Sequence, residues 1–590
     1  MKNITYAQED DAPHMPDSQF RPLPSVDGFL IQGLDLEQQG MEKTMDSITI
    51  ALVLLLAVIL SGTISRLLPL PVPLPLIQIA FGAAITGITG DGVVLEPDIF
   101  FLLFLPPLLF LDGWRIPKEG LFRDKGVILE LALGLVVFTV VGVGLLIHWM
   151  IPAMPLAVAF ALAAIVSPTD PVAVSAIAAR VPIPPRLMHI LEGESLLNDA
   201  SGLVCMRFAV AAAVTGTFSL TDALGTFLWV AIGGILIGFG VTWLVVRIKD
   251  TVSRKLGEDP GAQILISLLI PFGAYLVAEH LHCSGILAAV AAGITMSYAE
   301  LRGKALGITR VRRNAVWDTV QFALNGIIFV LLGEQLPGII SGAARVVTET
   351  GHVDPIWLIG YVIAINAALA ALRFVWVWVS LHFTLFRAAR RGQEIHKPHW
   401  KLLVATSLAG VRGAITLAGI LTLPFFLDDG ITPFPARDLA IFLAAGVIIF
   451  SLVAASVGLP FLLKDLELPP EPDHHQEEDT ARIASAEAAI RMIEKLQHAM
   501  SEGRTDADLY GEVGTRLMEL YRQRIDGRSK IGDEAEEVRR MEEVDKRLRL
   551  AALRAERDEI FRLSRARKVS EEIARKLIRE IDLAEARYTV

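Results

Sequence analysis

Residues 192–199 read EGESLLND, and they place three carboxylates, a hydroxyl and an amide inside an apolar run that spans about residues 187–214. An ionisable side chain at the centre of a bilayer costs about 2.5–3.5 kcal/mol, so such residues usually mark an ion or proton path. At helical spacing, Ser195 and Asp199 share one face, and Glu194 and Asn198 lie on the adjoining face. Oxygen ligands of this kind suit a hard cation. The stretch therefore predicts a membrane-spanning helix with a cation site.

The composition divides the chain into parts of different character. Of the 590 residues, 53% are hydrophobic. Apolar runs of about 20 residues, the length that crosses the hydrocarbon core, recur between residues 47 and 463. Residues 464–590 are instead rich in charge, and residues 1–44 are acidic and contain proline, which argues against a secretory signal peptide. We predict a disordered extension (1–44), a transmembrane domain (45–463) and a charged helical tail (464–590). Regulation of the transmembrane domain is one possible role of this tail.

The apolar runs predict an all-α polytopic membrane protein with about thirteen spans. One set of alternate loops holds nearly all the basic loop residues, whereas the opposite set offers only Arg345 and Arg437. Because basic loops stay in the cytoplasm, this asymmetry predicts an outside N-terminus and a cytoplasmic tail. The predicted spans lie near residues 47–65, 71–90, 98–114, 127–150, 155–178, 187–214, 223–246, 262–280, 283–300, 315–336, 356–385, 402–425 and 437–463.

Two of these spans are interrupted by proline or glycine. The fifth contains SPTDP at residues 167–171, where two prolines remove backbone donors and Thr169 and Asp170 add side-chain oxygens. The twelfth contains AGVRGA at residues 409–414, with Arg412 between glycines. The two spans are seven apart, an odd offset, which predicts inverted repeats with discontinuous helices and a substrate site between them.

Other charged residues in the spans need partners or solvent. A buried arginine needs a carboxylate, so we expect Glu194 to pair with Arg412, which would make Glu194 a poor proton carrier. Arg373 in the eleventh span is also expected to be buried and paired. Asp112 near the cytoplasmic end of the third span suits either an interfacial role or the ion path, and Glu192 suits the entrance to that path.

At these motifs the sequence resembles the cation–proton antiporter 1 family, the sodium/proton exchangers, and especially its bacterial members. The matching motifs are LPP at 105–107, TDP at 169–171, GESLLND at 193–199 and GVRGA at 410–414. The resemblance implies a thirteen-helix homodimer in which a core bundle slides against a dimerisation bundle.

The resemblance also implies roles for individual residues. Asp199 would carry either the cation or the proton, and Ser195 and the region around Thr169 would supply further ligands. Asn198 and Asp170 would also belong to the cation- and proton-binding site, where they would support the crossing point. The Asn-Asp pair at 198–199 is associated in the family with electroneutral one-for-one exchange. Several members carry an acidic residue where this chain has Leu111, and in this chain Asp112 follows one place later. Whether the third span supplies a carboxylate ligand is therefore an open question.

The expected function is thus the exchange of sodium or potassium for protons across a bacterial inner membrane. Ions and lipid are the expected partners, with no cofactor and no nucleic acid. The leading alternative is a channel or uniporter on the same scaffold, which would move cations without protons. An intramembrane hydrolase is disfavoured because no histidine or lysine lies at mid-membrane to act as a base for Ser195.

Overall fold

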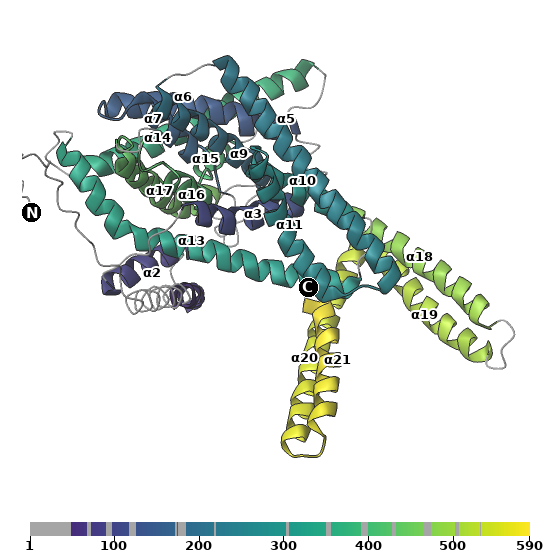
Figure 1. The fold of residues 1–590 in the computed structure, drawn as a ribbon. Coiled ribbons are helices and arrows are strands. Elements are labelled where there is room, and N and C mark those ends of the chain that lie inside the picture. The colour runs from purple at the N-terminus through teal and green to yellow at the C-terminus, as the bar shows by residue number, and fades with distance from the viewer. Residues whose placement is uncertain are drawn as a thin grey trace, which may run out of the picture. The chain divides into compact units, whose positions relative to one another are not determined.

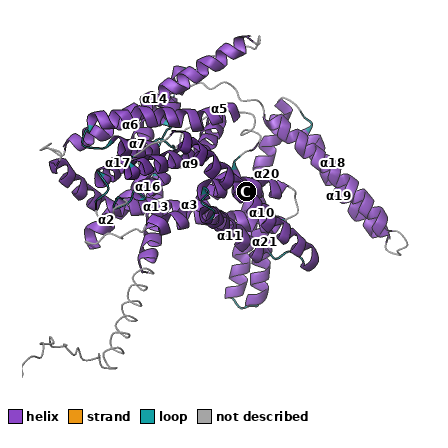
Figure 2. Ribbon diagram, turned by 45° about the horizontal axis from the view of Figure 1, so that its top comes forward, coloured by secondary structure: helices purple, strands orange, loops and turns teal. Residues whose placement is uncertain are grey.

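The structure is a computed structural model in which every regular element of the described residues is a helix (Figure 2). Contacts divide the chain into two compact units, Met1–Leu466 and Glu467–Val590. The predicted disordered extension, 1–44, lies outside the described residues. The residues that the structure describes are 49–67, 72–89, 97–116, 118, 125–170, 174, 185–216, 220–301, 306–349, 356–390, 399–427, 432–464, 474–501, 507–530 and 533–589.

The first unit contains the membrane-spanning helices. Eight helices of its described part are long and apolar enough to cross a bilayer, and three more are apolar but shorter. Thirteen spans in inverted repeats stay a prediction. The helices are Thr49–Leu67, α2 (Leu74–Thr89), α3 (Pro97–Arg115), α5 (Lys125–Leu129), the π-helix η1 (Glu130–Leu135), α6 (Val136–Met150), α7 (Leu156–Val166), α9 (Pro185–Thr215), α10 (Leu220–Leu256), α11 (Pro260–His280), α12 (Gly285–Leu301), α13 (Gly307–Glu349), α14 (Ile356–Arg390), α15 (Trp400–Leu408), α16 (Ala414–Leu421) and α17 (Arg437–Leu463).

These helices pack as two bundles. The first, the α13 bundle, joins α2, α3 and α10–α13, with α13 against α2 and α12 against both α3 and α10. The second, the α9 bundle, joins η1, α6, α7, α9 and α14–α17, which Figure 1 shows gathered in one part of the domain. Small residues permit the close approach of membrane helices. A Cβ added at Gly293 of α12, for example, would lie 2.0 Å from the carbonyl oxygen of Phe110 on α3.

The two predicted interruptions occur in the α9 bundle, and they lie against each other. Helix α7 ends at Val166, where proline begins to remove donors, and the chain runs non-helical to Asp170. The second break separates α15 from α16 between Leu408 and Ala414. The backbone N–H of Asp170 donates to the carbonyl of Val411, with 2.7 Å between nitrogen and oxygen. Each break therefore satisfies part of the backbone that the other leaves without helical partners.

The second unit is helical, as the charge pattern of the tail predicts. Its helices are α18 (His474–Ser501), α19 (Ala507–Arg528), α20 (Asp533–Arg565) and α21 (Glu571–Thr589), and α18 packs on α19 while α20 packs on α21. Arg528 links these hairpins, because it donates to Asp479 of α18 at 2.8 Å and to Glu542 of α20 at 2.5 Å. This guanidinium holds together three helices of the tail.

We expect Asp479→Asn to loosen the tail at neutral pH. The hydrogen bond from Arg528 holds the pKa of Asp479 below its ordinary value. A carboxyl whose pKa is lower in the folded state stabilises the fold above its unfolded pKa of about 3.9, and this contribution is lost as the pH falls through the folded value. Hydrogen exchange of the full-length protein should therefore be faster in α18 of the variant at pH 7, and the difference should shrink at about pH 3. A difference of equal size at both pH values would contradict the role of this carboxylate.

Candidate cation-binding site

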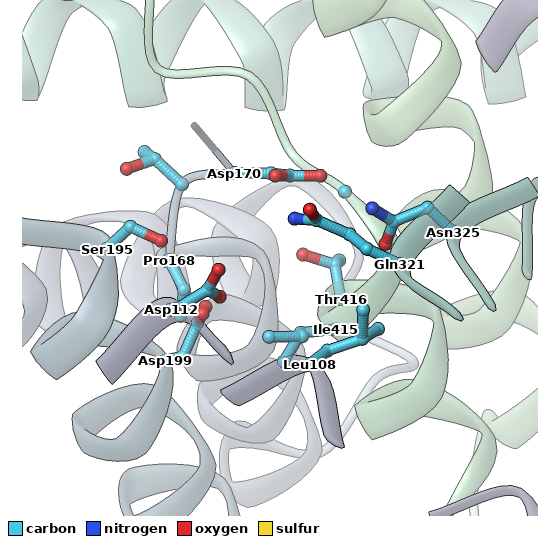
Figure 3. A pocket seen from close by; sticks show the side chains of 12 residues that line it. Leu108, Asp112, Pro168, Asp170, Ser195, Asp199, Gln321, Asn325, Ile415 and Thr416 are labelled. Carbon is cyan, nitrogen blue, oxygen red and sulfur yellow. The ribbon is translucent and has the colours of Figure 1, made fainter. Parts of the chain in front are cut away.

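A small cavity lies where the two bundles meet, and both bundles line it (Figure 3). Its volume is about 30 Å³. A cavity needs about 10–15 Å³ to hold one water, so this one has room for a water or two or for a small cation without its full hydration shell. Its polar lining residues are Asp112, Thr169, Asp170, Ser195, Asp199, Gln321, Asn325 and Thr416.

The wall from the α9 bundle contains two residues of the stripe predicted from residues 192–199. Ser195 and Asp199 lie one helical turn apart on α9, and both line the cavity. Thr169 and Asp170 reach it from the break after α7, because the unwound chain turns there. Asp199 is only 6% exposed, and among the residues that the structure describes no basic side chain forms an ion pair with it. Its carboxylate is thus buried beside a cavity without a fixed countercharge from an arginine or lysine.

The opposite wall comes from the α13 bundle and includes two residues that the sequence reasoning missed. Gln321 and Asn325 of α13 line the cavity from this side, and Asp112 of α3 lines the cavity as well. Figure 3 shows these two amides across the cavity from Ser195 and Asp199. Two amides four residues apart within the apolar tenth span are a signal that could have pointed to this wall. Thr416 of α16, three residues after Gly413, was missed as well.

Glu194 pairs with Arg373 of α14, and this corrects the predicted pair of Glu194 and Arg412. The contact is bidentate, with Nη1 of Arg373 2.5 Å from Oε1 of Glu194 and Nη2 2.7 Å from Oε2. Nε of the same guanidinium donates to the carbonyl of Thr406 on α15 at 3.0 Å. Both side chains are nearly fully buried. Arg373 is buried and paired as expected, and its partner is the carboxylate that the sequence assigned to another arginine.

The side chain of Arg412 donates hydrogen bonds to backbone carbonyls at the two helix breaks. Its Nε donates to the carbonyl of Val166, the last residue of α7, at 2.8 Å, and its Nη1 donates to the carbonyl of Gly410. A cation at a helix C-terminus is favourable because the helix dipole is negative there. Arg412 therefore bonds to backbone carbonyls of both broken segments and not to the Glu194 carboxylate. A count of charges cannot tell two buried arginines apart.

The Glu194–Arg373 pair supports the residues around Asp199. The amide nitrogen of Asn198 donates to Oγ1 of Thr169 at 3.2 Å, and the hydroxyl of Thr169 donates to Oε1 of Glu194 at 3.4 Å. The fifth span is therefore tied to α9 through a fixed, charged anchor. Glu192, predicted near the entrance, is half-buried and does not line the cavity.

We expect Gly413→Ala to abolish the cation–proton exchange predicted from the sequence, because the break before α16 leaves no room for a side chain. A Cβ at Gly413 would lie 1.7 Å from Oδ2 of Asp170, so the crossing of the two breaks would have to move. Overpacking a tight core costs about 1–3 kcal/mol, so the variant should still fold while its cavity is displaced. Cation-driven proton flux in proteoliposomes measures the effect, with Gly338→Ala, at an open position of α13, as the control. Normal flux in Gly413→Ala would contradict the observed crossing.

Comparisons with known proteins agree with this architecture. Residues 50–465 match the family model described as the transmembrane sodium/hydrogen exchanger. The chain is 44% identical over 540 residues to an uncharacterized Na(+)/H(+) exchanger of Escherichia coli (strain K12), covering 91% of this chain and 97% of the relative. It is 39% identical over 540 residues to a sodium, potassium, lithium and rubidium/H(+) antiporter of Bacillus pumilus (strain SAFR-032), covering 90% and 77% respectively.

A solved structure supports the fold. The sodium proton antiporter MjNhaP1 of Methanocaldococcus jannaschii, determined at pH 8, aligns with a TM-score of 0.54 and 19% sequence identity. The alignment covers 71% of this chain and 99% of that protein. At this identity the match concerns the arrangement of helices.

Proposed function

The chain belongs to the sodium/hydrogen exchanger family, and we propose that it exchanges sodium or potassium for protons across a bacterial inner membrane. The observation that carries the proposal is the contrast between two buried carboxylates on α9. Glu194 is held by the bidentate guanidinium of Arg373, whereas Asp199 faces a cavity of cation size without such a partner. Of the two, Asp199 is therefore the carboxylate that can exchange a bound proton for a bound cation.

In this mechanism Asp199 binds either one proton or one cation. Ser195 and Thr169 supply neutral oxygens to the cation, and Asp170 and Asn198 support the site, Asn198 through its bond to Thr169. A proton on the Asp199 carboxylate removes the negative charge that attracts the cation, so the two ligands exclude each other. Sodium or potassium is the transported substrate here, and no resident metal or cofactor is part of the mechanism.

Coupling follows if only the neutral forms of the site cross the membrane. A charged carboxylate is costly to move through a low-dielectric barrier, whereas the protonated or cation-loaded form is neutral. The α9 bundle carries this carboxylate and would slide against the α13 bundle within a homodimer, exchanging one cation for one proton without net charge. The asymmetry of the loop charges supports a cytoplasmic position for the tail.

Flux measurements on the purified protein test the proposal. In liposomes loaded with sodium and diluted into sodium-free buffer, sodium efflux should acidify the lumen, and clamping the membrane potential at zero with an equal concentration of a membrane-permeant lipophilic cation on both sides should leave the initial rate unchanged. The same experiment with potassium as the driving ion reports the selectivity. A cation channel would instead give a current in planar bilayers and no proton flux at a clamped potential. That result would contradict the proposal.

A further inference from the structure

The wall of the cavity on α13 has a role that the carrier residues do not explain. Gln321 and Asn325 are four residues apart, so they share one face of α13, and both side chains point toward the cavity (Figure 3). They belong to the α13 bundle, whereas Asp199, Ser195 and Thr169 belong to the α9 bundle. The polar lining is thus divided between two bodies.

Gln321 is held in one orientation by its neighbour on α3. Nη1 of Arg115 donates to Oε1 of Gln321 at 2.8 Å, and Nη2 of the same guanidinium pairs with Asp318. An amide has one carbonyl oxygen and one NH₂ group, so the end of Gln321 left for the cavity is the donor. A donor attracts the carboxylates and repels a cation, so Gln321 is suited to orient the empty, ionised site.

Asn325 offers the complementary chemistry. It lies one turn further along α13, where its side-chain oxygen can face the same cavity. Amide carbonyls are ordinary ligands of hard cations, and neutral oxygens complete a coordination shell without adding charge. A neutral ligand at this position adds no further charge to a cavity that the carboxylates of Asp112, Asp170 and Asp199 already line.

We propose that Asn325 is a cation ligand in only one conformation of the transport cycle, the one seen here, and that Gln321 is a positioning residue beside it. The inference rests on the proposed function, because sliding of the α9 bundle would carry Asp199 away from α13. In the other conformation the cation would keep the ligands of the α9 bundle and lose Asn325. The two membrane faces would then differ in cation affinity, with Asn325 as the cause.

The test compares the two faces of one protein. Wild type and Asn325→Leu are reconstituted in a single orientation, and the sodium KM of exchange is measured with sodium on the tail side and then on the opposite side. Loss of one neutral polar contact weakens binding about fivefold, so the ratio of the two KM values should shift by about that factor in Asn325→Leu. Phe322→Leu, on an exposed position of the same helix that does not line the cavity, should leave the ratio as in wild type.

The outcomes separate this inference from the proposed function. An unchanged KM on both faces, or an equal rise on both faces, would overturn the one-sided role of Asn325. Asn325→Ser keeps an oxygen in a shorter side chain and should shift the ratio of the two KM values less than Asn325→Leu does. The serine variant also tests the inference if the leucine variant does not fold. Wild-type protein without coupled flux would instead overturn the proposed exchange itself.

Discussion

Asp199→Asn is expected to abolish cation–proton exchange while leaving the protein folded. The asparagine has nearly the same shape, but it can neither release a proton nor supply the charge that a dehydrated cation needs. Proton flux driven by a sodium gradient should fall to the level of empty liposomes. Because removing a buried unpaired charge relieves a desolvation cost, the variant should unfold at the same or a higher temperature than wild type.

A matched control separates this effect from a general loss of carboxylates. Glu279 of the same domain accepts hydrogen bonds from Arg207 and from the backbone of Gly285, and it does not line the cavity. Glu279→Gln should retain exchange. Retention of full exchange in Asp199→Asn would show that another group carries the proton.

Breaking the ion pair between Glu194 and Arg373 should give the largest loss of stability. Removing one partner of a buried pair leaves an uncompensated charge and costs about 3–5 kcal/mol. Arg373→Met should therefore lower the melting temperature of the detergent-solubilised protein strongly, and Glu194→Gln in the same background should recover part of the loss. Thermal unfolding of the four proteins gives the coupling energy of the pair.

A second double-mutant cycle, with Arg412 in place of Arg373, distinguishes the observed ion pair from the one predicted from the sequence. Arg412 bonds to backbone carbonyls, so Arg412→Met should destabilise without any rescue by Glu194→Gln. A coupling energy between Glu194 and Arg412 that exceeds the one between Glu194 and Arg373 would contradict the structure.

Much of the site could be predicted because burial of charge in a membrane is so costly. The stripe from Glu192 to Asp199 and the prolines around Thr169 stand out from their apolar surroundings, and four of the five predicted binding residues line the observed cavity. The fifth, Asn198, bonds to Thr169 behind it. The break after α7 was predictable for a different reason, since proline removes donors regardless of tertiary context, and the break between α15 and α16 was predicted from the glycines on either side of Arg412.

What the sequence could not supply are the contacts between segments that are far apart in the chain. Glu194 and Arg373 are separated by 179 residues, and two buried arginines compete for one carboxylate. Only the packing of α14 on α15, with Arg373 bonded to the carbonyl of Thr406, decides the choice. Likewise, Gln321 and Asn325 are uncharged, so composition gives them little weight until α13 is seen to close the cavity.

The central claim is that a proton and a cation compete for the Asp199 carboxylate, and proton release on cation binding tests it most directly. Sodium is added to the purified protein in weakly buffered detergent solution at a pH where the site is protonated, while a pH indicator and a sodium-binding measurement are followed together. We expect about one proton to be released for each sodium bound, and none in Asp199→Asn. Sodium binding to the wild-type protein without proton release would contradict the claim.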